Sequence, residues 1–343
     1  MTGFGQAPGR VNLIGEHIDY NGGMVLPAAL SVGVSVELEP RDDDRVHLVA
    51  DQYEEPIERA ADEEARGDWS DPSLGALREA RGLGLIDRGA NLTIRSTIPQ
   101  GAGLSSSAAL TVAILKAARD MGGAVSPADQ DIAIAARRVE NDYLGVPCGI
   151  MDQFAVAMAS PGTAMALDTR SLEFELVDLP QDHSFVVLHS GVSRKLTDGR
   201  YRTRKIECDE AKAHFGTDDL CHLDPRDIRG STLADPTRKR ALHCATEHRR
   251  VVMAVEALKT GDFETVAETM NASHVSMRDD FEISLEPIDA LVSQATKSGA
   301  LGARLTGGGF GGCIVALVAN DRKASWLSDV LNLHPDARFI CEA

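Results

Sequence analysis

The sequence has few of the features that nucleic-acid-binding and membrane proteins need. Its 343 residues include 35 lysines and arginines against 52 aspartates and glutamates, which gives a formal net charge of −17 with no basic stripe. Such a chain repels polyanions, so nucleic acid is excluded as a partner. No uncharged apolar run approaches the length of a membrane span, and the first residues do not form a signal peptide. We expect a cytoplasmic protein without a membrane partner.

Cysteine is also scarce, and no two cysteines form a C-x-x-C pair. The spacing of cysteines and histidines is not that of a zinc site. The sequence therefore predicts reduced thiols. They are Cys148, Cys208, Cys221, Cys244, Cys313 and Cys341.

What is present is the composition of a globular protein. The length and the 43% of hydrophobic residues suffice for a sizeable core and favour two domains over one. Strand and helix patterns are mixed along the chain, which predicts an α/β or α+β class. The acidic stretch Asp42–Asp71 is interpreted as a solvated excursion without chemistry. We expect strands over Val32–Leu38 and Asn91–Arg95, helices over Ala108–Met121, Asp129–Leu144 and Arg238–Lys259, and a strand, glycine turn and strand over Ala300–Val318.

The stretch I-P-Q-G-A-G-L-S-S-S-A-A-L (Ile98–Leu110) is rich in glycine and serine and leads into a helix. Glycines let the backbone approach a ligand closely, and the N–H groups at a helix start suit an anion such as phosphate. A P-loop needs a lysine directly after its last glycine, but Leu104 follows Gly103 and the first lysine is Lys116. The stretch is therefore not a P-loop. Taken alone, it is either a phosphate loop of another kind or a capped helix after a glycine turn.

Further motifs make a family resemblance specific. A-P-G-R-V-N-L-I-G-E-H-I-D-Y-N-G-G (Ala7–Gly23) resembles the galactokinase signature, and the serine loop resembles the nucleotide loop of the wider family of galacto-, homoserine, mevalonate and phosphomevalonate (GHMP) kinases. L-T-G-G-G-F-G-G-C (Leu305–Cys313) is similar to that family's third motif. V-P-C-G-I-M-D-Q-F (Val146–Phe154), M-N-A-S-H-V-S-M-R-D-D-F (Met270–Phe281) and the segment around Tyr201 also resemble galactokinase segments. The likeness covers nearly the whole chain.

The resemblance implies the two-domain GHMP kinase fold, of the α/β (α+β) class. A ribosomal protein S5 domain 2-like domain over residues 1–183 would carry the first two motifs, and a ferredoxin-like domain over residues 184–343 the third, with the active site in the cleft between them. The implied cofactors are ATP and Mg2+, and a monomer is expected. The implied reaction is direct in-line transfer from ATP to the anomeric hydroxyl of galactose, which gives galactose 1-phosphate and ADP.

Such a transfer needs a base, a cation to neutralise charge and a metal ion. The resemblance makes Asp152 the base for the sugar hydroxyl and Arg10 the cation that keeps it ionised. Without the resemblance, Asp152 is equally a helix-capping aspartate and Arg10 a surface arginine. The family's metal ligands fall on Ser107 and Glu140, whose hard oxygens suit magnesium, although Glu140 alone reads as a helix-surface acid. The implied ATP-binding residues are Gly101, Ala102, Gly103, Leu104, Ser105, Ser106 and Ser107.

Sugar recognition needs a fixed array of hydrogen-bonding groups. By the same likeness, Glu16 and His17 would face the 6-hydroxyl, Asp19 the 3- and 4-hydroxyls, and Gly149 and Tyr201 would complete the pocket. A lone H-I-D would more often be ordinary surface or core. The glycine turn of the third motif would close over the substrate and phosphate region, or serve packing alone.

The sequence leaves alternatives open. One alternative is a related sugar 1-kinase that acts on N-acetylgalactosamine, arabinose or galacturonate, which would differ only in the pocket around C2 and C6 of the sugar. Glu16 argues against an acidic sugar because its charge would repel the sugar carboxylate. A sugar sensor without catalysis has a damaged serine loop, whereas S-S-S-A-A, Asp152 and Arg10 are all present here. Two positions depart from many galactokinases: Ile18 stands in place of a threonine, and Trp69 is followed by S-D-P-S.

Overall fold

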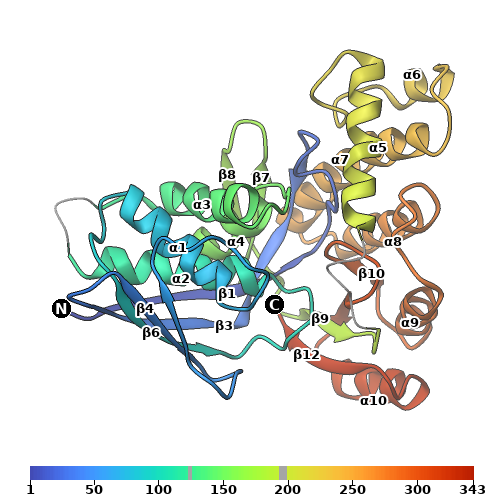
Figure 1. Ribbon diagram of the computed structural model, residues 1–343. Helices are drawn as coiled ribbons and strands as arrows, with labels where there is room; N and C mark the ends of the chain where they lie inside the picture. The colour runs from blue at the N-terminus through green and yellow to red at the C-terminus, as the bar shows by residue number, and fades with distance from the viewer. Residues whose placement is uncertain (123–125, 193–198) are drawn as a thin grey trace. The chain divides into compact units, whose positions relative to one another are not determined.

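The computed structural model describes residues 1–122, 126–192 and 199–343 (Figure 1). The chain divides into two compact units, each of which we describe by itself. Unit 1 comprises Met1–Arg10, Leu30–Gln100 and Leu104–Ala159, and unit 2 comprises Val11–Ala29, Gly101–Gly103 and Ser160–Ala343. The predicted domain limits, 1–183 and 184–343, stay a prediction.

Unit 1 is a mixed β-sheet with helices on one face (Figure 1). Its strands are β1 (Gly3–Asn12) and β3 (Pro27–Pro40), both of which continue into unit 2, with β4 (Arg45–Ala50), β5 (Ile57–Ala60) and β6 (Ala90–Ser96). Its helices are α1 (Asp71–Gly82), α2 (Ser106–Asp120), α3 (Asp129–Arg138), the π-helical turn η1 (Val139–Tyr143) and α4 (Met151–Met158). β3 pairs antiparallel with β6, β6 parallel with β4, β4 antiparallel with β5, and β1 lies beside β3.

Helix α2 forms the centre of the unit 1 core. Val112, Ile114 and Leu115 on it are fully buried, and each contributes about 1.5–3 kcal/mol by leaving water. At Gly5, β1 approaches α2 so closely that a Cβ on this residue would lie 2.0 Å from the carbonyl oxygen of Ala113. The predicted strands Val32–Leu38 and Asn91–Arg95 and the predicted helix Ala108–Met121 are confirmed as β3, β6 and α2.

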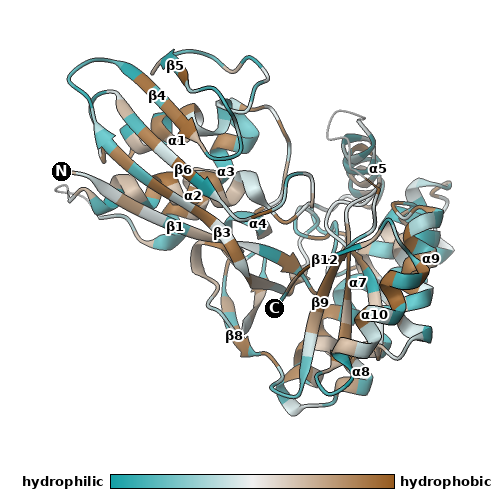
Figure 2. Cartoon of the chain, turned by 90° about the horizontal axis from the view of Figure 1, so that it is seen from below, coloured by the Kyte–Doolittle hydropathy of each residue, from teal (hydrophilic) through white to brown (hydrophobic). Residues whose placement is uncertain are grey.

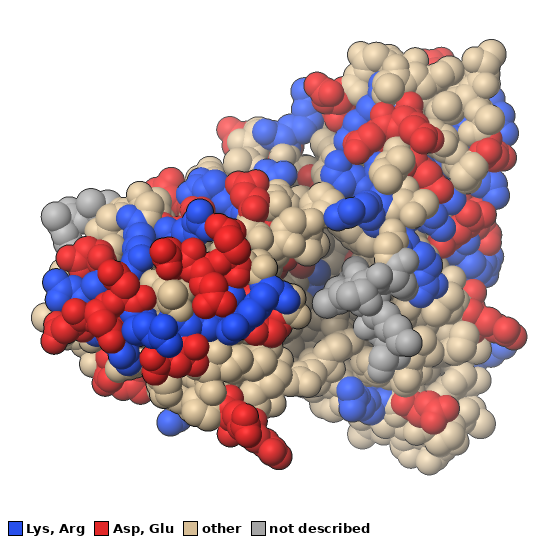
Figure 3. Space-filling view, viewed as in Figure 1, with Lys and Arg blue, Asp and Glu red and all other residues tan. Residues whose placement is uncertain are grey.

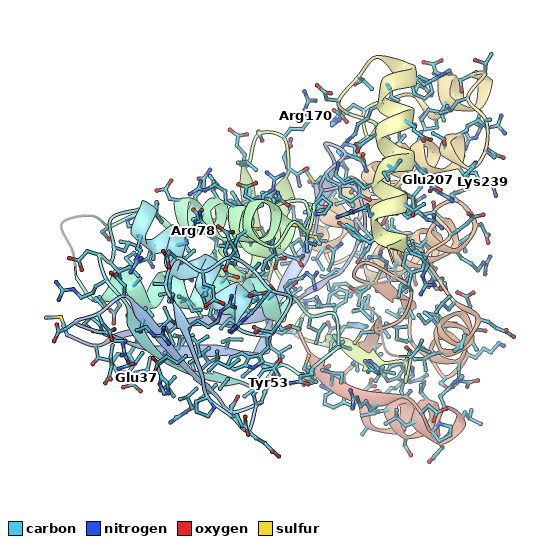
Figure 4. The ribbon with its side chains drawn as sticks, viewed as in Figure 1. Glu37, Tyr53, Arg78, Arg170, Glu207 and Lys239 are labelled. Atoms are coloured by element: carbon cyan, nitrogen blue, oxygen red, sulfur yellow. The ribbon has the colours of Figure 1, made fainter. Side chains whose placement is uncertain are left out.

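The acidic stretch is largely exposed or half-buried, as expected of a solvated segment, but a buried arginine anchors its second half. The side chain of Arg59 is 0% exposed and donates to Asp71 Oδ1 at 2.5 Å and to Ser70 Oγ at 2.9 Å. A buried arginine needs such partners, which fix the segment between β5 and α1. In the same stretch Trp69 stacks on Tyr53, labelled in Figure 4, with ring centroids 4.4 Å apart and planes 8° from parallel.

Unit 2 contains a four-stranded antiparallel sheet in the order β10-β11-β9-β12. The strands of this sheet are β9 (His183–His189), β10 (Gly302–Thr306), β11 (Cys313–Ala319) and β12 (Arg338–Glu342). Unit 2 also contains β7 (Thr163–Asp168), which pairs antiparallel with β2 (Met24–Val25) and with β8 (Phe174–Asp178). Its helices are α5 (Arg200–Phe215), α6 (Pro225–Gly230), α7 (Thr237–Thr260), α8 (Phe263–Asp279), α9 (Glu286–Lys297) and α10 (Lys323–Leu333). The predicted helix Arg238–Lys259 and the strand, turn and strand of Ala300–Val318 are confirmed as α7 and β10–β11.

The unit 2 sheet is covered by amphipathic helices. Helix α9 has a hydrophobic stripe and a hydrophilic side (Figure 2), and the stripe residues Ile288, Leu291, Val292 and Ala295 are buried. The fully buried Trp326 of α10 donates its indole N–H to the carbonyl oxygen of Ala295 at 2.8 Å. This bond satisfies the polar end of the largest buried side chain.

The surface carries many charged side chains. Charged side chains of both signs are interspersed on the face drawn in Figure 3. Of the helices in the described ranges, none combines the length and the hydropathy that crossing a membrane requires.

Candidate functional site

The glycines of the Ile98–Leu110 stretch form an open loop. Gly101 and Gly103, in unit 2, have φ angles of 71° and 74°, and a Cβ on either would meet no described atom within 4 Å. The backbone angle, not crowding, therefore requires glycine here. In unit 1, α2 begins three residues later at Ser106, so its unpaired N–H groups and positive dipole end follow the loop directly. This arrangement fits the predicted anion-binding role.

Ser105, directly before α2, has the left-handed backbone angles φ 61° and ψ 40°. That conformation costs a non-glycine residue on the order of 1–3 kcal/mol and persists where the surroundings impose it. A serine in this position usually bonds an N–H group of its own helix. Among the described residues, the Ser105 hydroxyl instead donates to Oδ2 of Asp152 at 2.6 Å and does not cap α2.

Arg10 also binds Asp152 within unit 1. Its Nε donates to Oδ1 and its Nη2 to Oδ2, each at 2.8 Å, which is the two-pronged geometry of strong arginine–carboxylate pairs. The Arg10 side chain is 6% exposed and that of Asp152 is 32% exposed, so the carboxylate is held firmly yet reaches solvent. The N-cap of α4 is Ile150, and Asp152 lies inside the first turn. The capping-aspartate and surface-arginine interpretations are therefore wrong.

Glu140 lies in η1, the wide helical turn that continues α3. Its Oε1 accepts a hydrogen bond from the hydroxyl of Ser107 in the first turn of α2. Burial raises the pKa of Glu140; the bond from Ser107 opposes this rise, and the charge of Asp152 adds to it. The hydroxyl and carboxylate oxygens thus converge at a position that favours a cation.

These oxygens fit the predicted magnesium ion. Magnesium takes hard oxygen ligands and usually needs only one or two carboxylates from the protein, because water and phosphate complete its octahedron. In the part of the chain that the structure describes, no group of three or more His, Cys, Asp or Glu side chains could hold a metal ion. The hydroxyl of Ser107 and the carboxylate of Glu140 are oxygen groups of the kind that such an ion takes from a protein.

His17, in unit 2, has an unusual backbone and a well-defined ring. Its φ of 62° is left-handed, and its ring lies among Tyr20, Tyr201 and Phe281, with centroids 5.8, 5.0 and 4.7 Å away. Nε2 lies 3.2 Å from the carbonyl oxygen of Gly308 and Nδ1 lies 2.7 Å from the Tyr20 hydroxyl. Since a carbonyl can only accept, Nε2 carries the proton and Nδ1 accepts from Tyr20.

Glu16 is buried at 1% exposure beside the third motif, also in unit 2. Its carboxylate binds the guanidinium of Arg304 and accepts the Gly307 N–H at 2.9 Å. Burial raises the pKa of Glu16, whereas Arg304 and the Gly307 N–H lower it. Glu16 of the first motif is therefore joined to the third motif by the Gly307 N–H and, directly before that motif, to Arg304 by an ion pair.

The predicted site residues thus fall into two groups. Unit 1 brings Arg10, Asp152 and Ser105 together, pairs Ser107 with Glu140, and places the buried Gly149 just before α4. Unit 2 holds the other group. It consists of Glu16, His17, the half-buried Asp19 and Tyr201, with Gly101, Ala102 and Gly103 of the loop.

Sequence reasoning missed Arg304 of β10 and the bond from Ser105 to Asp152. A signal for Arg304 was available, because it is the single charged residue in G-A-R-L-T, where all five positions are buried. An arginine in such a strand requires a buried acceptor. The bond of Ser105 had no signal, because a serine before a helix normally predicts a cap.

Comparison with known proteins places this geometry in a family. The model of the galactokinase galactose-binding signature matches residues 2–40, that of the GHMP kinases N terminal domain residues 73–160, and that of the GHMP kinases C terminal residues 254–333. The galactokinase of Haemophilus influenzae is 40% identical over an alignment of 329 positions, which covers 92% of this chain and 85% of that protein. The chain belongs to the galactokinase family. It is accordingly an ATP-dependent sugar kinase.

Solved structures of the galactokinase family and its relatives agree. The crystal structure of Lactococcus lactis galactokinase complexed with galactose has a TM-score of 0.94 and 32% identity, and covers 99% of this chain and 93% of that one. Methanococcus jannaschii mevalonate kinase, at 20% identity and a TM-score of 0.70, shares the fold over 99% of this chain and 97% of its own. The predicted two-domain GHMP kinase fold, with a mixed sheet and a four-stranded antiparallel sheet, is confirmed.

Proposed function

We propose that the protein transfers the γ-phosphoryl group of ATP to the anomeric hydroxyl of galactose and releases galactose 1-phosphate and ADP. The observation that carries the proposal is the Asp152 carboxylate, which Arg10 and Ser105 fix while a third of its side chain remains exposed. A base for a sugar hydroxyl needs this combination of fixed position and access. Galactose as the sugar is supported by the signature match over residues 2–40 and by the likeness to a galactokinase complexed with galactose.

In the proposed reaction Asp152 accepts the proton of the anomeric hydroxyl. The hydroxyl oxygen attacks the γ-phosphorus in line, the bond from that phosphorus to the β–γ bridging oxygen breaks, and ADP leaves with the bond's electrons. Arg10 keeps the Asp152 carboxylate in one orientation through its two hydrogen bonds and offers positive charge to the transferred group. No covalent phosphoenzyme forms.

ATP is assigned to the loop Gly101–Ser107, whose glycine angles and following helix start suit its phosphates. Ser107 and Glu140 would hold Mg2+, which when bound neutralises charge on the phosphate oxygens. The sugar is assigned to Glu16, His17, Asp19, Gly149 and Tyr201. A monomer suffices for this chemistry, since one chain supplies every proposed group.

Replacing the base tests the proposal. Asp152→Asn keeps the shape of the side chain and removes its ability to take a proton, so kcat should fall by at least about 10²–10⁴-fold. Asp131→Asn is the matched control, because Asp131 also lies in the first turn of a unit 1 helix but is exposed. Both purified variants should retain the circular dichroism of the wild type. Near-normal turnover by folded Asp152→Asn would refute the assignment of the base.

A further inference from the structure

Unit 2 contains two buried charges that no step of the proposed reaction uses. Arg304 of β10 and Glu247 of α7 both have side chains 0% exposed, and Nη2 of the first lies 3.8 Å from Oε1 of the second. Burying charge is costly unless it is fully partnered. Although burial raises it, the charges of Arg250 and Arg304 lower the pKa of Glu247 to about 2, so this carboxylate is ionised.

Besides Arg250 and Ser273, which also bind Glu247, both charges have partners on one segment, Leu13–Glu16. Nη1 of Arg304 donates to the carbonyl oxygen of Leu13 at 2.8 Å, and its Nη2 binds the Glu16 carboxylate. Oε1 of Glu247 accepts the N–H of Gly15 at 3.0 Å. Two side chains from β10 and α7 thus hold three of the four residues directly before His17.

Neighbouring groups of unit 2 complete this clamp. The hydroxyl of Thr306 donates to the carbonyl oxygen of Asn12 at 2.8 Å, and Nε2 of His243 donates to that of Glu16 at 3.1 Å. The backbone of Leu26 pairs with Leu13 and Ile14, and side chains of unit 2 therefore bind backbone groups of residues 12, 13, 15 and 16. The next residue, His17, is the one with the left-handed φ of 62°. A strained residue persists where its surroundings over-determine it, and the clamp supplies that constraint.

We propose that Arg304 and Glu247 are positioning residues for sugar binding, which hold Leu13–Glu16 so that His17 and Asp19 are oriented before the sugar arrives. The inference rests on the proposed assignment of His17 and Asp19 to the sugar. Both side chains are fully buried and bind backbone groups of Leu13 and Gly15, so we assign them a positioning role and not a sugar contact. A preorganised loop avoids the entropy cost of ordering on binding, so loss of the clamp weakens sugar affinity.

The test compares Michaelis constants in Arg304→Lys. Lysine keeps the charge, but its single nitrogen cannot reproduce the fork in which Nη1 binds Leu13 and Nη2 binds Glu16. We expect KM for the sugar to rise about tenfold or more and KM for ATP to change by less than about twofold. A loss of sugar binding that is equal in the ground state and the transition state raises the sugar KM and leaves the ATP KM unchanged. Sugar affinity measured by calorimetry without ATP should fall by the same factor. An unchanged sugar KM in folded Arg304→Lys would overturn the inference.

Arg59→Lys is the matched control. Arg59 is equally buried and also bound to a buried carboxylate, that of Asp71, but it lies in unit 1. The Arg59→Lys substitution should lower the midpoint temperature of unfolding without changing the sugar KM. If both lysine variants raise the sugar KM equally, the effect is general destabilisation and the inference fails.

A milder variant keeps the test decisive if Arg304→Lys does not fold. Thr306→Val preserves the side-chain shape and removes only the hydroxyl, which donates to Asn12 and lies 3.3 Å from Oε1 of Glu16. We expect its sugar KM to rise about threefold or more with a normal ATP KM, as expected for one lost hydrogen bond; no change would contradict the clamp. All variants are assayed with the sugar that the wild type phosphorylates best. A wild-type preference for a sugar other than galactose refutes the proposed substrate, while the KM ratios still decide this inference.

Discussion

Single residues set the chemistry of unit 1. At Ser105, the effect of the hydroxyl on catalysis can be separated from the effect of the strained backbone on stability. Glycine at this position removes the hydroxyl and relieves the left-handed backbone, whereas alanine removes the hydroxyl and keeps the strain. We expect Ser105→Gly and Ser105→Ala to lower kcat to a similar extent, about tenfold, since both lose a charge-assisted bond to Asp152. The glycine variant should melt at the higher temperature. Steady-state kinetics and thermal unfolding measure both effects, and a normal kcat in Ser105→Gly would mean that the hydroxyl is not needed.

Arg10 makes a second residue-scale prediction. A lysine cannot reproduce the two parallel bonds to Asp152, so Arg10→Lys should lower kcat about 10–100-fold and change the sugar KM by less than about threefold. Arg138→Lys is the control, because Arg138 pairs with Glu79 at the surface of the same unit, where the side chains are 43% and 24% exposed. Equal effects of the two substitutions would remove the special role of Arg10.

At the scale of elements, α7 gives unit 2 a pH-dependent stability. His243 on this helix is fully buried, and burial lowers its pKa from 6.5 to about 4, with opposing charges from Glu247 on one side and from Arg250 and Arg304 on the other. The unfolded chain takes up a proton as pH falls below about 6.5, while the folded chain does so only near pH 4. The stability that the buried, neutral imidazole of His243 contributes is therefore present above pH 6.5 and is lost as pH falls towards 4.

The expected loss from His243 is about 2 kcal/mol between pH 7 and pH 5. His243→Gln should flatten the pH dependence of the free energy of unfolding by about this amount, because glutamine does not titrate. The exposed His214 of α5 provides the control substitution, His214→Gln. Urea unfolding at both pH values measures the difference. The same slope in His243→Gln and wild type would show that another group carries the dependence.

The helices and strands also show which structural features could be predicted from the sequence. Helices α2 and α7 and the glycine turn between β10 and β11 follow from periodicity and turn chemistry, which act over a few residues. Arg59 and Arg304 do not follow from such patterns. Arg304 meets Glu16 across 288 residues of sequence, and no periodicity specifies a partner at that distance. The π-helical turn around Glu140 was likewise expected to continue an ordinary helix, because one inserted residue leaves the apolar pattern almost unchanged.

Of the candidate site, the sequence identified the groups and the structure supplied their partners. Asp152 and Arg10 were paired through family resemblance, and they meet 142 residues apart in unit 1. Ser105 was assigned to ATP alone, because serine before a helix does not indicate a bond to a distant carboxylate. Clamps on the backbone, such as the one on Leu13–Glu16, depend on carbonyl and N–H groups that every residue has, so they leave no signature in the sequence.

At the scale of the whole molecule, an acidic chain must bind a polyanionic nucleotide and a neutral sugar. The net charge of −17 opposes the approach of ATP, so the proposed function requires local donors, for which we propose the loop N–H groups, Arg10 and a metal ion. Sugar binding carries no such electrostatic penalty. It depends instead on a fixed array of hydrogen bonds, and the clamp on Leu13–Glu16 serves that requirement.

The measurement that tests the central claim most directly is ADP release from Mg-ATP with a panel of sugars, followed by phosphorus NMR of the product. The panel contains galactose, glucose, N-acetylgalactosamine, arabinose, galacturonate and a control without sugar. The proposed function predicts the highest kcat/KM with galactose and a product phosphorylated on C1. A preference for another sugar, phosphate on another carbon, or ADP release that does not depend on sugar would contradict it.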